Sequence, residues 1–219
     1  MVKKFRFDII SNSPGRYRLA TLHANDFLFE CGQYIKIFSR SGKQIPLSIA
    51  SSPLYLPKLK IIYRPDPGNP DSLLLDDLLG QETVEGTSPL GLVRYPLDDE
   101  NLVLICKGTG ISQAASMAEH CKLISSSREI LMIWNTDKTL GAHEQDSPEI
   151  WFPPINQIIS NHLDLLKYLE TQRKTLKNAH CIITGDPEFV HAVHDLLSKY
   201  NFSTGSIQSD VFEYSPRNF

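Results

Sequence analysis

The chain has 219 residues, of which 41% are hydrophobic and 21% are charged, so its composition is that of an ordinary globular protein with room for one large or two small domains. The formal net charge of −3 argues against a nucleic-acid partner, which would need a strongly basic surface. The apolar runs are far shorter than the ~20 residues that cross a bilayer, so no membrane segment is expected.

The first half of the chain is expected to form a β-barrel. Short β-type runs alternate with turn residues and prolines, a pattern typical of an antiparallel barrel or sandwich. A capping residue, leucines at helical spacing and a final Gly80 predict one short helix over 71–79. The predicted strands cover 5–11, 17–22, 34–39, 47–50, 58–63 and 83–87.

The second half repeats a pattern of buried strand, turn and helix. This alternation predicts a parallel sheet flanked by helices. The charged, proline-containing stretch 95–100 is the expected boundary, so the predicted fold has two domains: an antiparallel β-barrel over 1–98 and an α/β domain over 99–219. The predicted strands are 102–106, 130–134, 157–159, 181–183 and 207–212, and the helices are 112–123, 163–176 and 188–200.

A glycine loop connects the first strand of the predicted α/β domain to its helix. Gly108-Thr109-Gly110 stands at this junction, where backbone amides and the positive end of a helix can bind a phosphate. Thr109 and Ser112 add hydroxyl donors. Lys107 could add positive charge, although its expected role is that of a solvated residue at the strand end. A tight turn also requires glycine, so a phosphate site and a structural turn remain alternatives.

Other reactive residue types are expected to have structural roles. The four cysteines lack Cys-x-x-Cys spacing and are predicted to be reduced packing residues. His191 and His194 could share a helical face, but a third ligand is not evident, so no metal site is predicted. The first residues lack the apolar stretch of a secretory signal, and a cytoplasmic location is expected.

Separated segments resemble one protein family in the same order. The chain is similar to the ferredoxin-NADP reductase superfamily, and within it to small bacterial NAD(P)H:flavin oxidoreductases. The matching segments are Ile45-Pro46-Leu47-Ser48-Ile49-Ala50-Ser51 for the flavin motif, Gly108-Thr109-Gly110-Ile111-Ser112 for the pyridine-nucleotide loop, Thr184-Gly185-Asp186-Pro187 for a later loop, and Ser209-Asp210-Val211-Phe212 for the closing acidic-aromatic strand.

The resemblance implies an oxidoreductase that transfers hydride from NAD(P)H to a flavin. The barrel would bind the flavin, the α/β domain would bind the nicotinamide nucleotide, and a downstream acceptor would take the electrons. Ser48 would be the catalytic residue, its hydroxyl directed at flavin N5. The residues assigned to cofactor binding on this basis are Pro46, Leu47, Ile49, Ala50, Ser51, Gly108, Thr109, Gly110, Ser112, Gly185, Asp186 and Phe212.

The flavin motif departs from the family pattern at two positions. Ile45 replaces the arginine that would hold the flavin phosphate, and Leu47 replaces the aromatic residue that would pack on the ring. Arg40, Lys43 and Arg64 are basic residues close in sequence that could compensate. We therefore expect a weakly bound flavin (riboflavin, FMN or FAD) that is recognised through its ring. The alternative is a non-catalytic binding or assembly module that keeps the fold without flavin chemistry.

The residues after the strand at 130–134 leave the choice between NADH and NADPH open. Thr136 and Lys138 would suit a 2′-phosphate, whereas Asp137 would favour a free 2′-hydroxyl.

Overall fold

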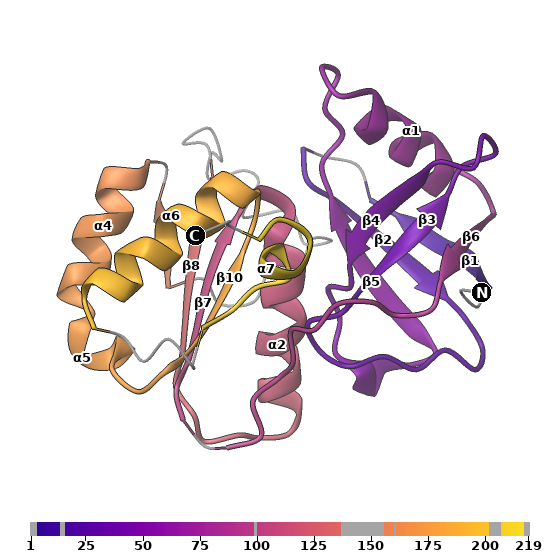
Figure 1. Ribbon diagram of the computed structural model, residues 1–219. Coiled ribbons are helices and arrows are strands. Elements are labelled where there is room, and N and C mark those ends of the chain that lie inside the picture. The colour runs from indigo at the N-terminus through magenta and orange to yellow at the C-terminus, as the bar shows by residue number, and fades with distance from the viewer. Residues whose placement is uncertain are drawn as a thin grey trace.

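The chain folds into an antiparallel barrel and a parallel sheet that lie side by side (Figure 1). The computed structural model describes residues 4–13, 16–98, 100–136, 156–159, 161–201 and 207–216. No described strand crosses the stretch 88–101, and we propose the domain boundary at 98/99 within it.

The N-terminal sheet has six antiparallel strands in the order β4-β3-β6-β1-β2-β5. A bridge between Ile49 and Ile61 joins its two edges, so the sheet curls into a barrel. Helix α1 packs on the barrel core through Leu75, Leu78 and Leu79, so the predicted barrel with a short helix is confirmed. The elements are β1 (Lys4–Asn12), β2 (Arg18–His23), β3 (Tyr34–Phe38), β4 (Gln44–Ser48), the 3-10 turn η1 (Pro53–Tyr55), β5 (Lys58–Tyr63), α1 (Pro70–Leu79) and β6 (Thr83–Thr87).

The C-terminal sheet has five parallel strands in the order β11-β10-β7-β8-β9, which confirms the predicted α/β class. Strand order reverses between β7 and β10, so a topological switch point lies at their carboxyl ends. The elements are β7 (Leu102–Lys107), the 3-10 turn η2 (Gly108–Gly110), α2 (Ile111–Leu123), β8 (Ile130–Asn135), β9 (Gln157–Ile159), α4 (His162–Thr171), α5 (Arg173–Leu176), β10 (His180–Thr184), α6 (Pro187–Lys199), β11 (Ile207–Gln208) and α7 (Val211–Tyr214).

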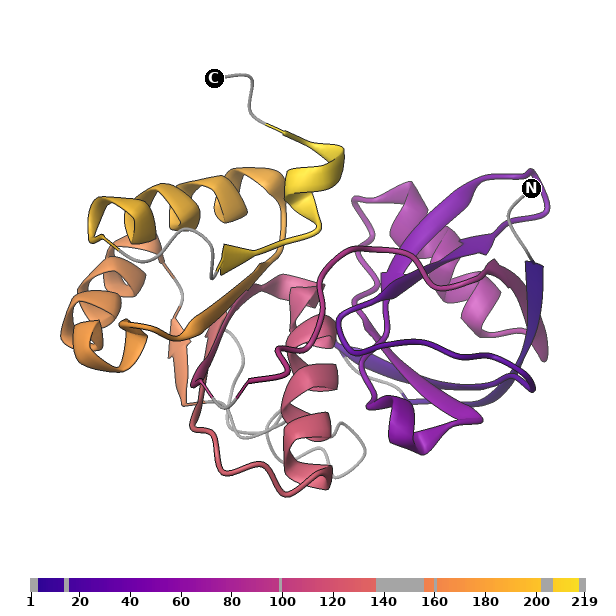
Figure 2. The same ribbon diagram turned by 60° about the horizontal axis from the view of Figure 1, so that its bottom comes forward.

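Helix α2 lies between the parallel sheet and the barrel in both views (Figures 1 and 2). Its polar side chains bind the barrel backbone: the Ser116 hydroxyl donates to the Ser51 carbonyl at 2.7 Å, and the Ser52 amide donates to Glu119 Oε2 at 2.6 Å. Glu119 is 2% exposed and forms an ion pair with Lys60 at 3.1 Å. These contacts fix the two sheets relative to each other.

The end of the chain differs from the sequence-based prediction. The predicted strand 207–212 ends at Gln208, and the helical turn α7 replaces its second half. The cause is Ser209, whose hydroxyl accepts a hydrogen bond from the Val211 amide and whose carbonyl accepts one from the Phe212 amide, both at 3.3 Å. These bonds bend the backbone before the strand can continue.

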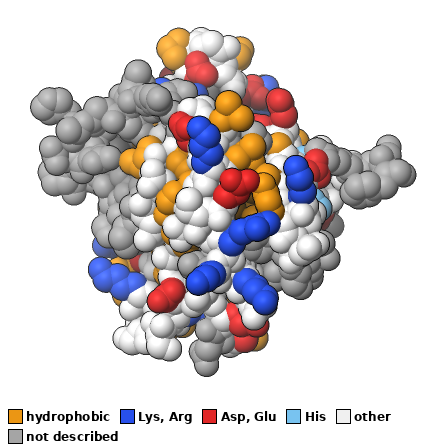
Figure 3. Space-filling model, turned by 90° about the vertical axis from the view of Figure 1, so that its left-hand side faces the viewer, with side chains coloured by type: hydrophobic (Ala, Val, Ile, Leu, Met, Phe, Trp, Pro, Cys, Tyr) orange, Lys and Arg blue, Asp and Glu red, His pale blue; other side chains and the backbone are white. Residues whose placement is uncertain are grey.

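The four cysteines are free and buried. Burial raises the pKa of the Cys31 and Cys181 thiols to about 12, so these thiols stay protonated and act as packing residues. On the face seen in Figure 3, acidic and basic side chains are interspersed around apolar ones. Across the described parts of the chain, no helix is long and apolar enough to span a bilayer.

Candidate functional site

A cleft of about 940 Å³ separates the barrel from the parallel sheet. Strands β3, β4 and β5 and the start of α1 form one wall. The carboxyl ends of β7, β8 and β10 and the segment around β11 and α7 form the other wall. This second wall contains the switch point between β7 and β10, where open α/β sheets bind ligands. The cleft is therefore the candidate site.

Most of the residues assigned from the sequence line this cleft. Three members of the flavin motif do not: Ile49 is fully buried in the barrel core, Ala50 is 2% exposed, and Ser51 is fully buried. The Ser51 hydroxyl accepts a hydrogen bond from the Lys60 amide at 3.0 Å. These three residues are packed inside the protein and do not line the cleft, and their assignment to cofactor binding stays a prediction. The assigned residues that do line the cleft are Pro46, Leu47, Ser48, Gly108, Thr109, Gly110, Ser112, Gly185 and Asp186.

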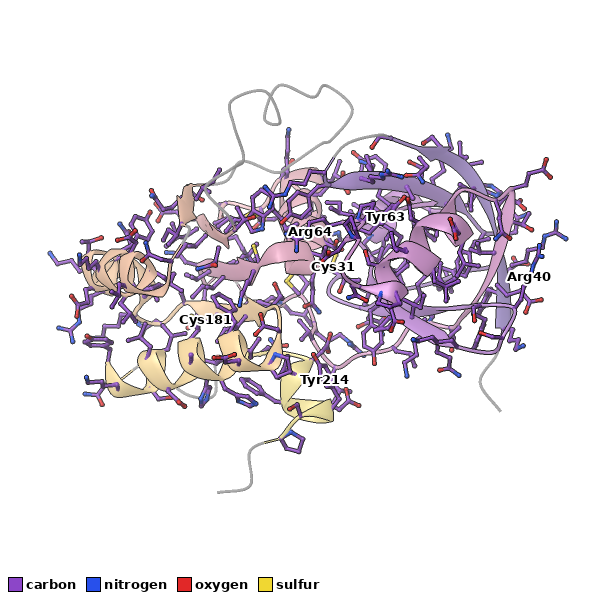
Figure 4. All side chains as sticks on the ribbon, turned by 90° about the horizontal axis from the view of Figure 1, so that it is seen from above. Cys31, Arg40, Tyr63, Arg64, Cys181 and Tyr214 are labelled. Carbon is purple, nitrogen blue, oxygen red and sulfur yellow. The ribbon has the colours of Figure 1, made fainter. Side chains whose placement is uncertain are left out.

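Helix α7 turns Phe212 away from the cleft and brings Tyr214 into its wall. The Phe212 ring packs against His191 at 5.9 Å and His194 at 5.2 Å between ring centroids, so this histidine pair supports α7. Figure 4 shows Tyr214 near the junction of the two domains. The sequence predicts that Phe212, on a strand, lines the site. Because this segment is helical, Tyr214 lines the cleft instead.

The hydroxyl of Ser48 is available to a ligand. Ser48 ends β4 opposite Tyr34 of β3, and both residues line the cleft. Ile45 and Leu47 alternate with Ser48 along β4 and belong to the barrel core, with 7% and 8% of their surface exposed. The Ser48 hydroxyl forms no hydrogen bond with any residue that the structure describes. It can therefore donate one to a molecule in the cleft.

The start of α1 forms one end of the cleft, where the helix amides and the nearby carboxylates already have partners. The Asn69 side chain accepts hydrogen bonds from the amides of Asp71 and Ser72 at 3.0 and 3.4 Å, which are the amides that a phosphate would otherwise use. Asp66 and Asp71 also line the cleft, and Asp71 forms an ion pair with Lys43. This end is poorly suited to a phosphate.

Of the three basic residues noted in the flavin segment, Arg64 lines the cleft. Its guanidinium lies 6.0 Å from the ring centroid of Tyr17 and 4.0 Å from the Asp66 carboxylate. Figure 4 shows Arg64 between the two domains and Arg40 at the far edge of the barrel. Arg40 therefore cannot replace the missing arginine of the flavin motif.

The two glycines of the nucleotide loop have different reasons to be glycine. Gly108 has φ +55°, and a Cβ there would meet nothing within 4 Å, so its backbone is open to a ligand. At Gly110 a Cβ would lie 2.8 Å from the Thr184 backbone. Glycine at 110 is required by the packing of β10 against the loop. Of the two alternatives for this loop, the structural turn therefore accounts for Gly110, whereas Gly108 remains available to a phosphate.

The loop hydroxyls also differ. The Ser112 hydroxyl, expected to face a phosphate, donates to the Ile62 carbonyl at 2.9 Å and so connects α2 to β5. The Thr184 hydroxyl donates to the Gly110 carbonyl at 2.8 Å. Within the described residues the Thr109 hydroxyl has no hydrogen-bond partner, so Thr109 is the loop hydroxyl that remains available.

An ion pair between Lys107 and Asp186 lies beside the Gly108–Gly110 loop. Lys107 Nζ is 2.7 Å from Asp186 Oδ2, and both residues line the cleft. Burial pushes the pKa of Asp186 upward, but hydrogen bonds from Lys107 and from the Phe189 amide outweigh it, so this pKa lies below its usual value. Gly185 permits the pairing, because a Cβ there would lie 2.9 Å from Lys107 Cβ. Lys107 therefore lines the cleft as an ion-paired residue, whereas the sequence favoured a solvated one.

Asp210 joins three segments at the cleft wall. Its carboxylate accepts hydrogen bonds from Gln113 Nε2 at 2.8 Å and from the amides of Leu92 and Val93 at 3.0 and 3.3 Å. Burial, and after it the Asp210 charge, raise the pKa of the Tyr34 phenol. Asp210 therefore holds the connecting segment, α2 and the chain end in one arrangement around the cleft.

The opposite end of the cleft is closed by a contact between the domains. The Tyr17 hydroxyl lies 3.1 Å from Thr136 Oγ1, and the Tyr17 ring packs edge-on against Trp134 at 5.1 Å between centroids. Asp137 and Lys138, on which the choice of coenzyme depends, lie outside the described residues.

No family model matches the sequence. Among curated proteins, the chain is 25% identical over 205 residues to reductase component 1 of terephthalate 1,2-dioxygenase from Comamonas, a match that covers 86% of this chain and 60% of that protein. It is 33% identical over 116 residues to the reductase subunit of an aromatic O-demethylase from Amycolatopsis, covering 50% of this chain and 35% of that protein. The chain thus spans 60% or less of the length of these relatives.

Solved structures resemble the chain over nearly its whole length. A cytochrome P450 reductase from Amycolatopsis has a TM-score of 0.77 at 21% identity, covering 95% of this chain and 69% of that one. A phthalate dioxygenase reductase has a TM-score of 0.71 at 20% identity, covering 94% and 68%. A ferredoxin NADP+ reductase from Neisseria gonorrhoeae with bound FAD and NADP has a TM-score of 0.75 at 14% identity, covering 95% and 98%. The expected resemblance extends to the fold: this chain has the two-domain fold of ferredoxin-NADP reductase-like proteins.

Proposed function

We propose that the chain is an oxidoreductase that transfers hydride from NAD(P)H to a weakly held flavin. The observation that carries this proposal is the shared cleft, in which Ser48 and Tyr34 on the barrel wall face the Gly108–Gly110 loop and Gly185 on the other wall. Hydride transfer requires two rings to be aligned in a site shielded from water, and such alignment is the protein's contribution. A bound flavin would supply the ring that accepts the hydride.

Each wall has residues suited to one of the two ligands. On the barrel wall, the Ser48 hydroxyl would donate a hydrogen bond to the flavin ring, and Tyr34 and Tyr214 offer aromatic surface beside it. On the other wall, the open backbone at Gly108 and the hydroxyl of Thr109 would bind the coenzyme pyrophosphate. Such a transfer would require no catalytic acid or base from the protein, because hydride would pass directly between the two rings.

The cleft fits the ring of a flavin better than its phosphate. Ile45 is packed in the barrel core, the amides at the start of α1 are occupied by Asn69, and Lys43 and Arg64 are already paired with the carboxylates of Asp71 and Asp66. Recognition would therefore depend on the ring, and riboflavin should bind at least as well as FMN or FAD. Weak binding also suits a flavin that leaves after reduction.

The electrons are proposed to pass to a downstream acceptor. The two curated relatives are named as a reductase component of a dioxygenase and a reductase subunit of a demethylase, so both deliver electrons to another component. This chain spans only part of each relative, and we propose the same direction of transfer for it.

Purified protein assayed with NADH and NADPH, each with riboflavin, FMN or FAD, tests the function. We expect oxidation of the coenzyme that depends on added flavin, and quenching of flavin fluorescence that is no weaker for riboflavin than for FMN. Flavin that survives gel filtration in stoichiometric amount would contradict weak binding. Absence of flavin binding and of coenzyme oxidation in every combination would favour the non-catalytic module, which the unsuitable phosphate end of the cleft makes the second candidate.

A further inference from the structure

We propose that Lys107 binds the pyrophosphate of the coenzyme and that its ammonium group pairs with the Asp186 carboxylate when no coenzyme is bound. This inference rests on the proposed function. Lys107 is the last residue of β7 and directly precedes Gly108. Its Nζ lies 2.7 Å from Asp186 Oδ2, so the ion pair stands beside the loop where the pyrophosphate would bind.

The pair joins the carboxyl ends of two neighbouring strands. Strands β7 and β10 are adjacent and parallel, with Cys106 paired to Thr184, so Lys107 and Asp186 follow at the switch point. Their side chains are 44% and 45% exposed. Ion pairs with this exposure contribute little stability, so an incoming anion can open this one at small cost.

Lys107 is the partner that can move. Asp186 is held as the N-cap of α6, where its Oδ1 accepts a hydrogen bond from the Phe189 amide at 3.0 Å. A lysine ammonium at the end of a four-carbon chain can instead turn from one anion to another without moving the backbone. The pyrophosphate of a dinucleotide carries two negative charges. It would therefore compete with the Asp186 carboxylate for Lys107 at a site that already offers the Gly108 backbone and the Thr109 hydroxyl.

Because of this exchange, removing the charge of Asp186 and removing the charge of Lys107 should change the affinity for coenzyme in opposite directions. Removing the lysine charge should weaken coenzyme binding. Removing the carboxylate charge should strengthen it, because Lys107 then no longer has to leave a carboxylate to bind the pyrophosphate. Asp186→Asn is suited to this test, since asparagine is an equally good N-cap and keeps α6 intact.

The experiment measures binding of ADP-ribose, which has the pyrophosphate but no redox chemistry, by titration calorimetry, and binding of NADH and NADPH by fluorescence. The variants are Lys107→Gln, Asp186→Asn and the two together, with Lys122→Gln as the control for a lost lysine charge, because Lys122 is exposed at the far end of α2. We expect Lys107→Gln to weaken ADP-ribose about tenfold, equal to about 1.4 kcal/mol. We expect Asp186→Asn to strengthen it about threefold. Adenosine, which lacks phosphate, should bind all variants alike.

The outcomes separate this inference from the proposed function. If wild type binds coenzyme and Lys107→Gln binds it within about twofold as well, the inference is wrong and the function stands. If Asp186→Asn strengthens binding equally in the Lys107→Gln background, Asp186 acts by direct repulsion and does not hold Lys107, which also overturns the inference. If neither wild type nor Asp186→Asn binds ADP-ribose, NADH or NADPH, the proposed function fails, and the inference fails with it. Thermal unfolding of each variant checks that the fold is intact.

Discussion

Replacement of Ser48 by alanine tests the barrel wall of the cleft. The Ser48 hydroxyl is half-buried at the end of β4, and within the described residues it has no hydrogen-bond partner. The substitution removes one donor from the cleft and leaves no buried group without its partner. We therefore expect the free energy of unfolding to change by less than about 0.5 kcal/mol.

Turnover, by contrast, should fall by about tenfold to a hundredfold in Ser48→Ala. A hydroxyl that donates to the flavin ring binds it more strongly as negative charge develops there, and loss of one such donor can cost about 10²-fold or more. Because Ser48 is partly exposed, we expect a loss at or below that limit. A tenfold to hundredfold loss corresponds to an increase of about 1.4–2.7 kcal/mol in the activation free energy. KM for flavin and coenzyme should change much less, because the bond strengthens mainly in the transition state.

Ser112→Ala is the matched control, since Ser112 lines the same cleft but its hydroxyl donates to the Ile62 carbonyl at 2.9 Å. Loss of this hydrogen bond in Ser112→Ala should lower the free energy of unfolding by about 1 kcal/mol and Tm by about 2–4 °C. Turnover should stay within about twofold of wild type. Steady-state assays of flavin-dependent coenzyme oxidation and thermal unfolding compare the two variants. Unchanged turnover in Ser48→Ala, or equal losses of turnover in both variants, would refute the role assigned to Ser48.

Two further predictions concern stability. Lys60→Met should lower the free energy of unfolding by about 3 kcal/mol, because the buried Glu119 carboxylate loses its ion pair. Glu119→Gln should cost only about 1 kcal/mol, since the amide oxygen still accepts a backbone hydrogen bond; equal costs in urea denaturation would contradict this. Gly110→Ala should lower Tm more than Gly108→Ala, because the new Cβ meets the Thr184 backbone at 2.8 Å in the first and open space in the second. Melting curves of the two glycine variants give the comparison, and the reverse order would show that strain at positive φ dominates.

Elements with a local signal could be predicted from the sequence. The expected bounds of β5 (Lys58–Tyr63) and β6 (Thr83–Thr87) agree with the structure, because both are short runs containing β-branched residues and bounded by turn residues. Strand β4 was expected at 47–50 but covers Gln44–Ser48. The strand therefore includes Pro46. Proline is rare within strands but is tolerated here because β4 is an edge strand of its sheet.

The detailed chemistry of the cleft could not be predicted, because it depends on contacts between distant residues. The motif placed Ser112 at the nucleotide loop, but its hydroxyl partner Ile62 lies 50 positions away in another domain. The same holds for Lys107, whose ion pair with Asp186 depends on the pairing of β7 with β10. A motif identifies the loop, whereas the tertiary fold decides which of its donors are already engaged and which remain for a ligand.

The structure uses different side chains to hold the domains together and to meet a ligand. On α2, Ser116 and Glu119 are occupied by contacts with the barrel, whereas Ser48 and Thr109 keep their hydroxyls unengaged within the described residues. The walls of the cleft are therefore fixed before a ligand enters, which favours alignment of two rings. Ile45 stands where the family has an arginine that binds the flavin phosphate. The absence of that arginine lowers the binding energy of the ground state and of the transition state equally. It should raise KM for flavin and leave turnover at saturating flavin intact, so weak flavin binding and efficient hydride transfer are compatible in this fold.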